Sequence, residues 1–120
     1  MKHYMHLNPQ PFAGIKSGVQ QIESRLNDDK RQQIKVGDDI EFTDRANGET
    51  FVAQVIELLR HPSFEELFSS QPPQAFGGGT KQELLDAVYK YYSPEDEQRY
   101  GVVGIKLQTL PTANLDTKDL

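Results

Sequence analysis

The chain has 120 residues, no cysteine and a formal net charge of −5. This length predicts one domain able to bury a core, and the lack of cysteine excludes disulfides, thiolate metal sites and a cysteine nucleophile. The acidic balance argues against duplex DNA as a partner, and the absence of a long apolar run or an apolar signal core predicts a cytoplasmic protein without a membrane partner.

The first part of the chain predicts two strands around a short helix. Lys2–Leu7 alternates as a strand does, and the Asn-Pro pair after it ends the strand. Pro9–Ser17 is predicted as a helix, because proline suits the first helical position and Gly18 can take the left-handed conformation that ends a helix. Val19–Leu26 is then predicted as the second strand.

The middle of the chain predicts a β-hairpin. Ile40–Asp44 and Thr50–Leu59 are rich in β-branched and aromatic residues, and Asn47-Gly48 between them is a strong hairpin signal. These strands are short, and no strand-helix-strand alternation accompanies them. The pattern therefore predicts an α+β fold with a small mixed β-barrel, rather than a doubly wound parallel sheet.

The second half of the chain predicts three helices and a last strand. Ser63–Ser70 and Lys81–Tyr92 each have a Ser or Thr cap followed three residues later by Glu, and Ser93–Tyr100 has proline at its first helical position. Val102–Leu110 is predicted as the final strand. We expect one domain over residues 1–110 and a polar tail over residues 111–120.

A cluster of polar side chains lies on the predicted second strand. Glu23 and Arg25 are two residues apart and share one face of that strand. They are either an ion pair at the rim of the barrel, or a site where the carboxylate accepts from a base amino group and the guanidinium binds a carbonyl or phosphate. The amide of Gln20 can bind a base edge or simply the backbone where the strand begins.

Three segments, in this order, resemble the ASCH domain family. Residues 18–25, GVQQIESR, resemble the family signature of Gly, any residue, Lys, two of any residue, Glu, any residue and Arg. Val36-Gly37-Asp38 resembles a Gly-Asp turn of the family, and residues 91–105 resemble the close of many bacterial members. The resemblance spans about residues 3–110. It implies a PUA-like fold, with helices flanking one cleft, and roles in RNA binding or RNA metabolism.

A bacterial branch of this family hydrolyses the acylated exocyclic amine of cytidine with a Lys, a Thr and a Glu. By motif these residues fall at Gln20, Glu23 and Glu83. An amide does not titrate as a lysine does, and Glu23 replaces the hydroxyl, so the resemblance favours recognition over turnover. The nearest lysines that could substitute are Lys16 and Lys35.

The loop over residues 71–79 is the second candidate wall of the site. It holds Phe76 before three glycines, which predicts either a mobile lid that stacks on a ligand or a plain connection between helices. Glu83 after it is either a helix-capping acid or a site residue. His3 and His6 differ in strand parity, so we expect no metal site, and nothing indicates a cofactor.

These observations support three hypotheses. The leading one is binding of RNA or a nucleoside-like ligand in a cleft lined by Lys16, Gln20, Glu23, Arg25 and Phe76. The second is hydrolysis of an acylated nucleoside or of RNA, with Glu23 or Glu83 as the general base that activates water. The third is a protein-interaction domain that uses the helices Ser63–Ser70 and Lys81–Tyr92.

Overall fold

The computed structural model describes residues 1–109, so the predicted tail lies outside the described residues. The elements in chain order are β1 (Lys2–Leu7), α1 (Pro9–Ser17), β2 (Ile22–Leu26), η1 (Arg31–Gln33), β3 (Asp39–Asp44), β4 (Thr50–His61), α2 (Phe64–Ser69), η2 (Pro73–Phe76), α3 (Lys81–Val88), α4 (Pro94–Tyr100) and β5 (Val102–Thr109). Within residues 1–109, none of the helices has the length and apolar character needed to span a bilayer.

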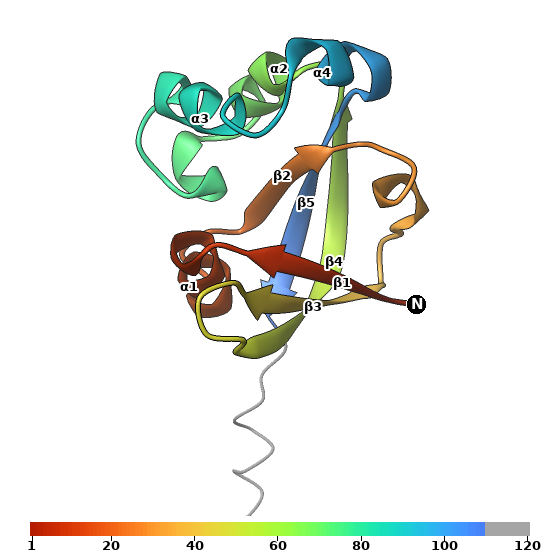
Figure 1. Ribbon diagram of the computed structural model, residues 1–120, viewed down its shortest axis with the longest axis vertical. Coiled ribbons are helices and arrows are strands. Elements are labelled where there is room, and N and C mark those ends of the chain that lie inside the picture. Colours follow the sequence, from red (N-terminus) through yellow and green to blue (C-terminus); the bar gives the residue numbers. More distant parts are fainter. Residues whose placement is uncertain (110–120) are drawn as a thin grey trace, which may run out of the picture.

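The five strands form one mixed sheet in the order β1-β3-β4-β5-β2. β1 pairs with β3 in parallel, and the other neighbours are antiparallel. A β-bulge between Val55 and Glu57 interrupts the register of β4, and bulges bend the strand that carries them. The sheet curls into a half-barrel with β1 and β2 as its two edges (Figure 1). The predicted α+β class with a small mixed barrel is thus confirmed, in half-barrel form.

Two hydrophobic cores lie on opposite faces of the sheet. The first fills the half-barrel and includes Met5, Leu7, Phe12, Ile15, Phe42, Phe51, Val103 and Ile105. The second lies between the sheet and the helices and includes Ile22, Leu26, Phe64, Leu67, Phe68, Phe76 and Val102. In Figure 1, α1 covers one end of the half-barrel, and α2, α3 and α4 form a separate helical layer beyond β2.

Most predicted elements have the predicted bounds to within a few residues, with two informative differences. β2 begins at Ile22 rather than Val19, because the N–H of Gln20 donates to Gly14 O and that of Gln21 donates to Ala75 O instead of continuing the strand. α3 ends at Val88 rather than Tyr92, and turns follow it, in which the N–H groups of Lys90 and Tyr91 donate three residues back.

The helices of the second half are short, and side chains satisfy their free N–H groups. Ser63 Oγ accepts from Glu66 N at 3.1 Å, and Thr80 forms the predicted reciprocal capping box with Glu83. Glu97 Oε2, from α4, accepts from the N–H of Phe64 at the start of α2 at 2.7 Å. Because helices of six to eight residues are marginal by themselves, these caps and the aromatic core hold the layer together.

Candidate functional site

A cleft of about 480 Å³ lies between the half-barrel and the helical layer. Its floor comes from β2 and the residues just before it, one wall from the junction of β1 and α1, and the other wall from η2, α3 and the turn after α3. The volume is within the range of pockets that bind small molecules. Of the predicted site residues, Gln20, Glu23, Arg25 and Phe76 line this cleft.

An ion pair between Glu23 and Arg25 forms the floor. The two residues are paired with Ile105 and Val103 on β5, which belong to the half-barrel core, so both side chains point to the concave face of the sheet. Arg25 Nε donates to Glu23 Oε2 at 2.7 Å, and each side chain is 12% exposed. The expectation that these two side chains share a face is met.

Arg25 also joins the two open edges of the sheet. Its Nη2 donates to the carbonyl of His6 on β1 at 2.9 Å, which is the contact that a backbone ladder would supply in a closed barrel. Burial is the largest single influence and lowers the pKa of Arg25, but Glu23, Tyr92 and Asp28 together outweigh it and the pKa is raised. Burial also raises the pKa of nearby Tyr92, so the floor holds a permanent cation beside a neutral phenol.

Gln20 lies at the meeting point of the two halves and is 8% exposed. Its Nε2 donates to Ile22 O at 3.0 Å, which satisfies a carbonyl at the free edge of β2. A Cβ on Gly14 would lie 3.1 Å from Gln20 Cβ, and a Cβ on Gly77 would lie 2.8 Å from Gln20 Oε1. Glycine is therefore favoured on both sides of this amide, most strongly at Gly77, where the positive φ of 112° adds backbone strain for any other residue.

The wall opposite β1 is apolar. Phe68, Phe76, Leu84 and Val88 line the cleft there, and Tyr92 lies beside them. The sequence left open whether Phe76 lies on a mobile lid or on a plain connection between helices. In the structure the residue ends η2, is 5% exposed, and packs its ring edge-on against Phe68 at 5.0 Å. Its ring thus belongs to the helical core, because the short 3₁₀ turn directs it inward.

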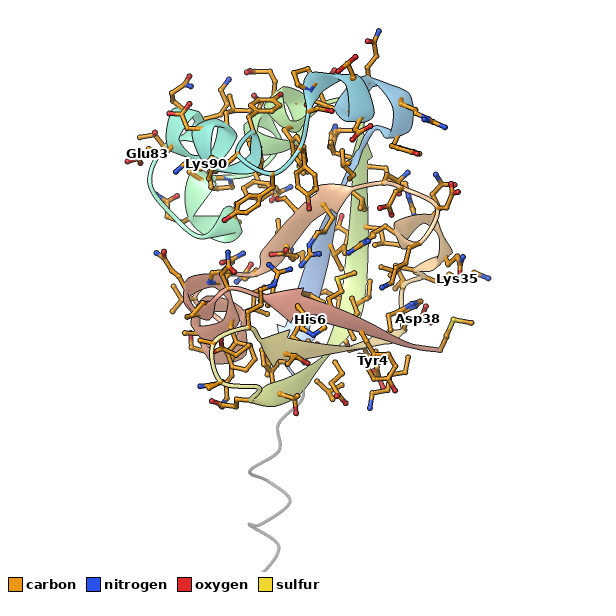
Figure 2. All side chains as sticks on the ribbon, viewed as in Figure 1. Tyr4, His6, Lys35, Asp38, Glu83 and Lys90 are labelled. Carbon is orange, nitrogen blue, oxygen red and sulfur yellow. The ribbon has the colours of Figure 1, made fainter. Side chains whose placement is uncertain are left out.

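Lys16 and Glu83 are the two predicted site residues that do not line the cleft. Lys16 is exposed on α1, where its Nζ forms an ion pair with Glu49. Glu83 Oε1 accepts from Thr80 N at 2.9 Å as part of the capping box, which holds the carboxylate at the start of α3. Figure 2 shows Glu83 at the outer side of the helical layer, apart from His6 on β1. Of the two roles expected for Glu83, the structure shows the helix-capping acid, and Glu83 is not placed to act as a base in this cleft.

The polar cleft residues that were not predicted as site residues include His6, Asn8, Arg45 and Tyr91. Asn8 precedes α1 but makes no side-chain cap, so its amide is free to accept from Arg45 Nη1 at 3.5 Å and donate to Tyr91 Oη at 3.3 Å. The second contact connects the two walls. These residues come from three distant segments, and only the aromatic run around Tyr91 gave a local signal.

The cleft combines a polar floor with an apolar wall. Glu23 Oε1, Gln20 Oε1 and Arg25 Nη1 have no hydrogen-bond partner among residues 1–109, and none of these atoms is a fully buried unsatisfied group. They can therefore accept from and donate to a ligand. Within the same residues, no three His, Asp or Glu side chains gather as a metal ion would require.

Comparison with known proteins places this architecture. The family model of the ASCH domain matches residues 5–111. The chain is similar to the crystal structure of hypothetical protein PH0355. The alignment covers 92% of this chain and 100% of PH0355, with 32% sequence identity and a TM-score of 0.83. It is also similar to the solution structure of PF0455 from Pyrococcus furiosus. That alignment covers 92% of this chain and 98% of PF0455, with 31% sequence identity and a TM-score of 0.74.

A more distant likeness shows the fold alone. The ZmASCH S128A mutant protein from Zymomonas mobilis is 14% identical, covers 95% of this chain and 76% of its own, and has a TM-score of 0.57. The comparison with curated proteins found no match.

Proposed function

The chain belongs to the ASCH domain family, and on that premise we propose that it binds a nucleoside-like ligand, free or within RNA, in the cleft between the half-barrel and the helices. The observation that carries the proposal is the convergence of Gln20, Glu23 and Arg25 on one solvent-reachable cleft opposite an apolar wall. A nucleobase has a polar edge and apolar faces, so it suits both surfaces.

The free atoms of the floor define which base edges fit. Two of them, Glu23 Oε1 and Gln20 Oε1, are acceptors, and one, Arg25 Nη1, is a donor. A base with an exocyclic amino group beside a carbonyl satisfies both kinds, because the amino group donates to the acceptors and the carbonyl accepts from the guanidinium. Cytosine and guanine have this combination, whereas uracil has no amino group.

Titration calorimetry with cytidine, guanosine and uridine tests the proposal. We expect the two amino-bearing nucleosides to bind at least about tenfold more tightly than uridine, since a buried acceptor left without its partner costs about 1–3 kcal/mol. Glu23→Gln conserves the shape of the side chain and should reduce this preference. Lys16→Gln, outside the cleft, is the matched control and should not.

Two results would contradict the proposal. One is the failure of all nucleosides and short single-stranded RNAs to bind below millimolar concentration. The other is a binding constant that Glu23→Gln and Arg25→Ala leave unchanged, which would place the ligand elsewhere on the surface.

Hydrolysis of an acylated nucleoside is a second candidate, and it depends on Glu23. This is the only carboxylate lining the cleft among residues 1–109, and one of its oxygens is free. It would take a proton from water as the water attacks the acyl carbon, and the proton would pass to the leaving amine. Incubation with N4-acetylcytidine and product analysis test this. Turnover that persists in Glu23→Gln would remove the assignment.

The protein-interaction hypothesis finds less support. The apolar residues of α2, namely Phe64, Leu67 and Phe68, are buried in the helical core. The large apolar side chains exposed on α3 and the turn after it are Tyr89 and Tyr91, within the part of the chain that the structure describes. Two tyrosines do not form the contiguous patch that marks a protein interface.

A further inference from the structure

We propose that the ligand of this cleft carries one phosphate group, bound by Arg45 at the mouth, and is a nucleoside monophosphate rather than an RNA strand. The inference rests on the proposed nucleoside site and names the ligand class that fits it. It follows from the charges that line the cleft, from the donors around Arg45, and from the lack of a cationic track leading out of the cleft.

The charges in the cleft do not cancel. Glu23 neutralises Arg25 through their hydrogen bond, and no second carboxylate lines the cleft among the described residues. Arg45 takes part in no ion pair within residues 1–109, and its one side-chain contact there is the long bond to Asn8. An unpaired guanidinium in a cleft of an acidic protein indicates an anionic ligand.

The neighbourhood of Arg45 consists of donors and neutral groups. The neighbouring Asp44 carboxylate is turned into the hairpin, where Oδ1 accepts from Ala46 N at 2.8 Å. Tyr91 Oη accepts from Asn8 Nδ2, which leaves its own O–H free to donate. The imidazole of His6 and the amide of Gln10 line the same cleft. A phosphate needs several donors around a cation, and the cleft supplies them.

The position of Arg45 relative to the floor suits a single nucleotide. Arg25 Nη2 donates to the carbonyl of His6, and Arg45 N donates to the carbonyl of the next residue, Leu7. The guanidinium of Arg45 reaches Asn8 Oδ1 at 3.5 Å, so the residues that hold the two guanidinium groups, His6 and Asn8, are two apart in the chain. Consecutive Cα atoms are about 3.8 Å apart, so these two residues lie within about 8 Å of each other. A base on the floor would therefore place its own ribose phosphate, rather than that of a distant nucleotide, at the mouth.

A strand of RNA would need more cations than this cleft offers. Proteins that bind single strands use a basic groove that follows the backbone over several nucleotides. Near this cleft, Lys16 is paired with Glu49 and Lys106 with Glu57, and Lys90, beside Tyr91, is the exposed lysine without a carboxylate partner among residues 1–109. The formal net charge of the chain is −5. One unpaired arginine in the cleft, with one lysine beside it, suits a single phosphate better than a backbone of several phosphates.

Calorimetry with cytidine, its 5′- and 3′-monophosphates, inorganic phosphate and a cytidine tetranucleotide tests the inference. We expect one monophosphate to bind at least about tenfold more tightly than cytidine at low salt, because one charge-assisted contact changes affinity by about that factor. The two monophosphates distinguish the position of the phosphate. The tetranucleotide should gain nothing further, with a salt slope of about one.

Arg45→Gln should bring the ratio of monophosphate to nucleoside affinity close to one. Arg99→Gln, an exposed arginine of α4 stacked on Tyr100, is the matched control and should conserve the ratio. Because Arg45 is exposed in the β3–β4 turn, thermal unfolding should show that the variant folds.

Each alternative result has a distinct meaning. Equal affinity for cytidine and both monophosphates, or a preference that survives Arg45→Gln, overturns the phosphate site and leaves the proposed function standing. Much tighter binding of the tetranucleotide with a steep salt dependence identifies an RNA strand as the ligand instead. If neither cytidine nor any nucleotide binds, the proposed function fails and this inference fails with it.

Discussion

The half-barrel and the helical layer face each other across the cleft but are stabilised in different ways. In the half-barrel, backbone ladders connect β1, β3, β4, β5 and β2 in one continuous sheet around an aliphatic and aromatic core. In the helical layer, three helices of six to eight residues are connected by caps and by rings packed around Phe64. Helices of this length depend on their packing, whereas a five-stranded sheet has its own ladder.

This difference assigns distinct roles to the two sides of the cleft. The floor residues Glu23 and Arg25 lie on a strand that is hydrogen-bonded along its length to β5, so their geometry is fixed before a ligand arrives. The apolar wall has no strand ladder and depends mainly on side-chain packing and helix caps, with one backbone bond from Gln21 N to Ala75 O. Gln20 joins the two, because it contacts Gly14 of α1 and Gly77 of the helical half. We therefore expect the helical wall to be the less stable half.

The largest expected effect comes from Phe64→Ala. Phe64 is fully buried and packs against Phe68, Tyr89 and Tyr92 at ring-centroid distances of 5.8, 6.1 and 5.6 Å. We expect a loss of about 3–5 kcal/mol in unfolding free energy, as for other buried Phe to Ala changes. Amide hydrogen exchange should show lost protection in α2–α4 while the strands stay protected.

Phe42→Ala is the matched control in the half-barrel, since Phe42 is equally buried. It should lower protection throughout the molecule, because the strands carry both halves. If Phe64→Ala lost amide protection equally in the half-barrel and in the helical layer, the helical layer would not be the less stable half.

Arg25→Ala should have the next largest effect. It removes the contact between β2 and β1 and leaves the Glu23 carboxylate without its partner. Breaking a fully buried pair costs about 3–5 kcal/mol, and partial exposure of this pair lowers our expectation to about 2–3 kcal/mol. A double-mutant cycle with Glu23→Gln, followed by urea denaturation, measures the coupling. Coupling near zero would show that the half-barrel does not need this pair.

Raising the pH should weaken the helical layer before the half-barrel. Burial, together with hydrogen bonds from Tyr89 Oη to the Glu97 carboxylate, raises the pKa of Tyr89 from 10.0 to about 12. A raised pKa means that this contribution is complete below pH 10 and is lost as the pH passes through about 12. Unfolding followed between pH 8 and 12 should show the loss, and Tyr89→Phe should lack it. An identical alkaline profile for the two proteins would exclude the assignment.

The smallest expected effect is that of Gly77→Ala, which tests the junction. Gly77 has φ of 112°, and an added Cβ would lie 2.8 Å from Gln20 Oε1. We expect a loss of about 1–2 kcal/mol from backbone strain, with a further loss from displacement of the Gln20 amide. Gly48→Ala, with φ of 77° and no atom near the added Cβ, isolates the strain term. If both variants lose the same stability, Gln20 does not connect the two halves as proposed.

Local features of the fold were predictable because their causes lie within a few residues. The prolines at the start of α1, the left-handed Gly18 with φ of 87° and the Thr80–Glu83 capping box all follow from short-range geometry. The shared face of Glu23 and Arg25 follows from the period of a strand. Neither short-range geometry nor the strand period predicted the position of Gln20. Its N–H donates to Gly14 O in α1, and its side chain lies between Gly14 and Gly77.

The element types, the helix caps and the shared face of Glu23 and Arg25 follow from the amino-acid sequence. Long-range packing chose which polar side chains meet in the cleft: it buried Phe76, left Glu83 in its capping box, paired Lys16 with Glu49, and brought His6 and Arg45 into the lining. Spacing along the chain fixes local hydrogen bonds and strand faces. The wall that a segment faces depends instead on long-range packing between the half-barrel and the helical layer.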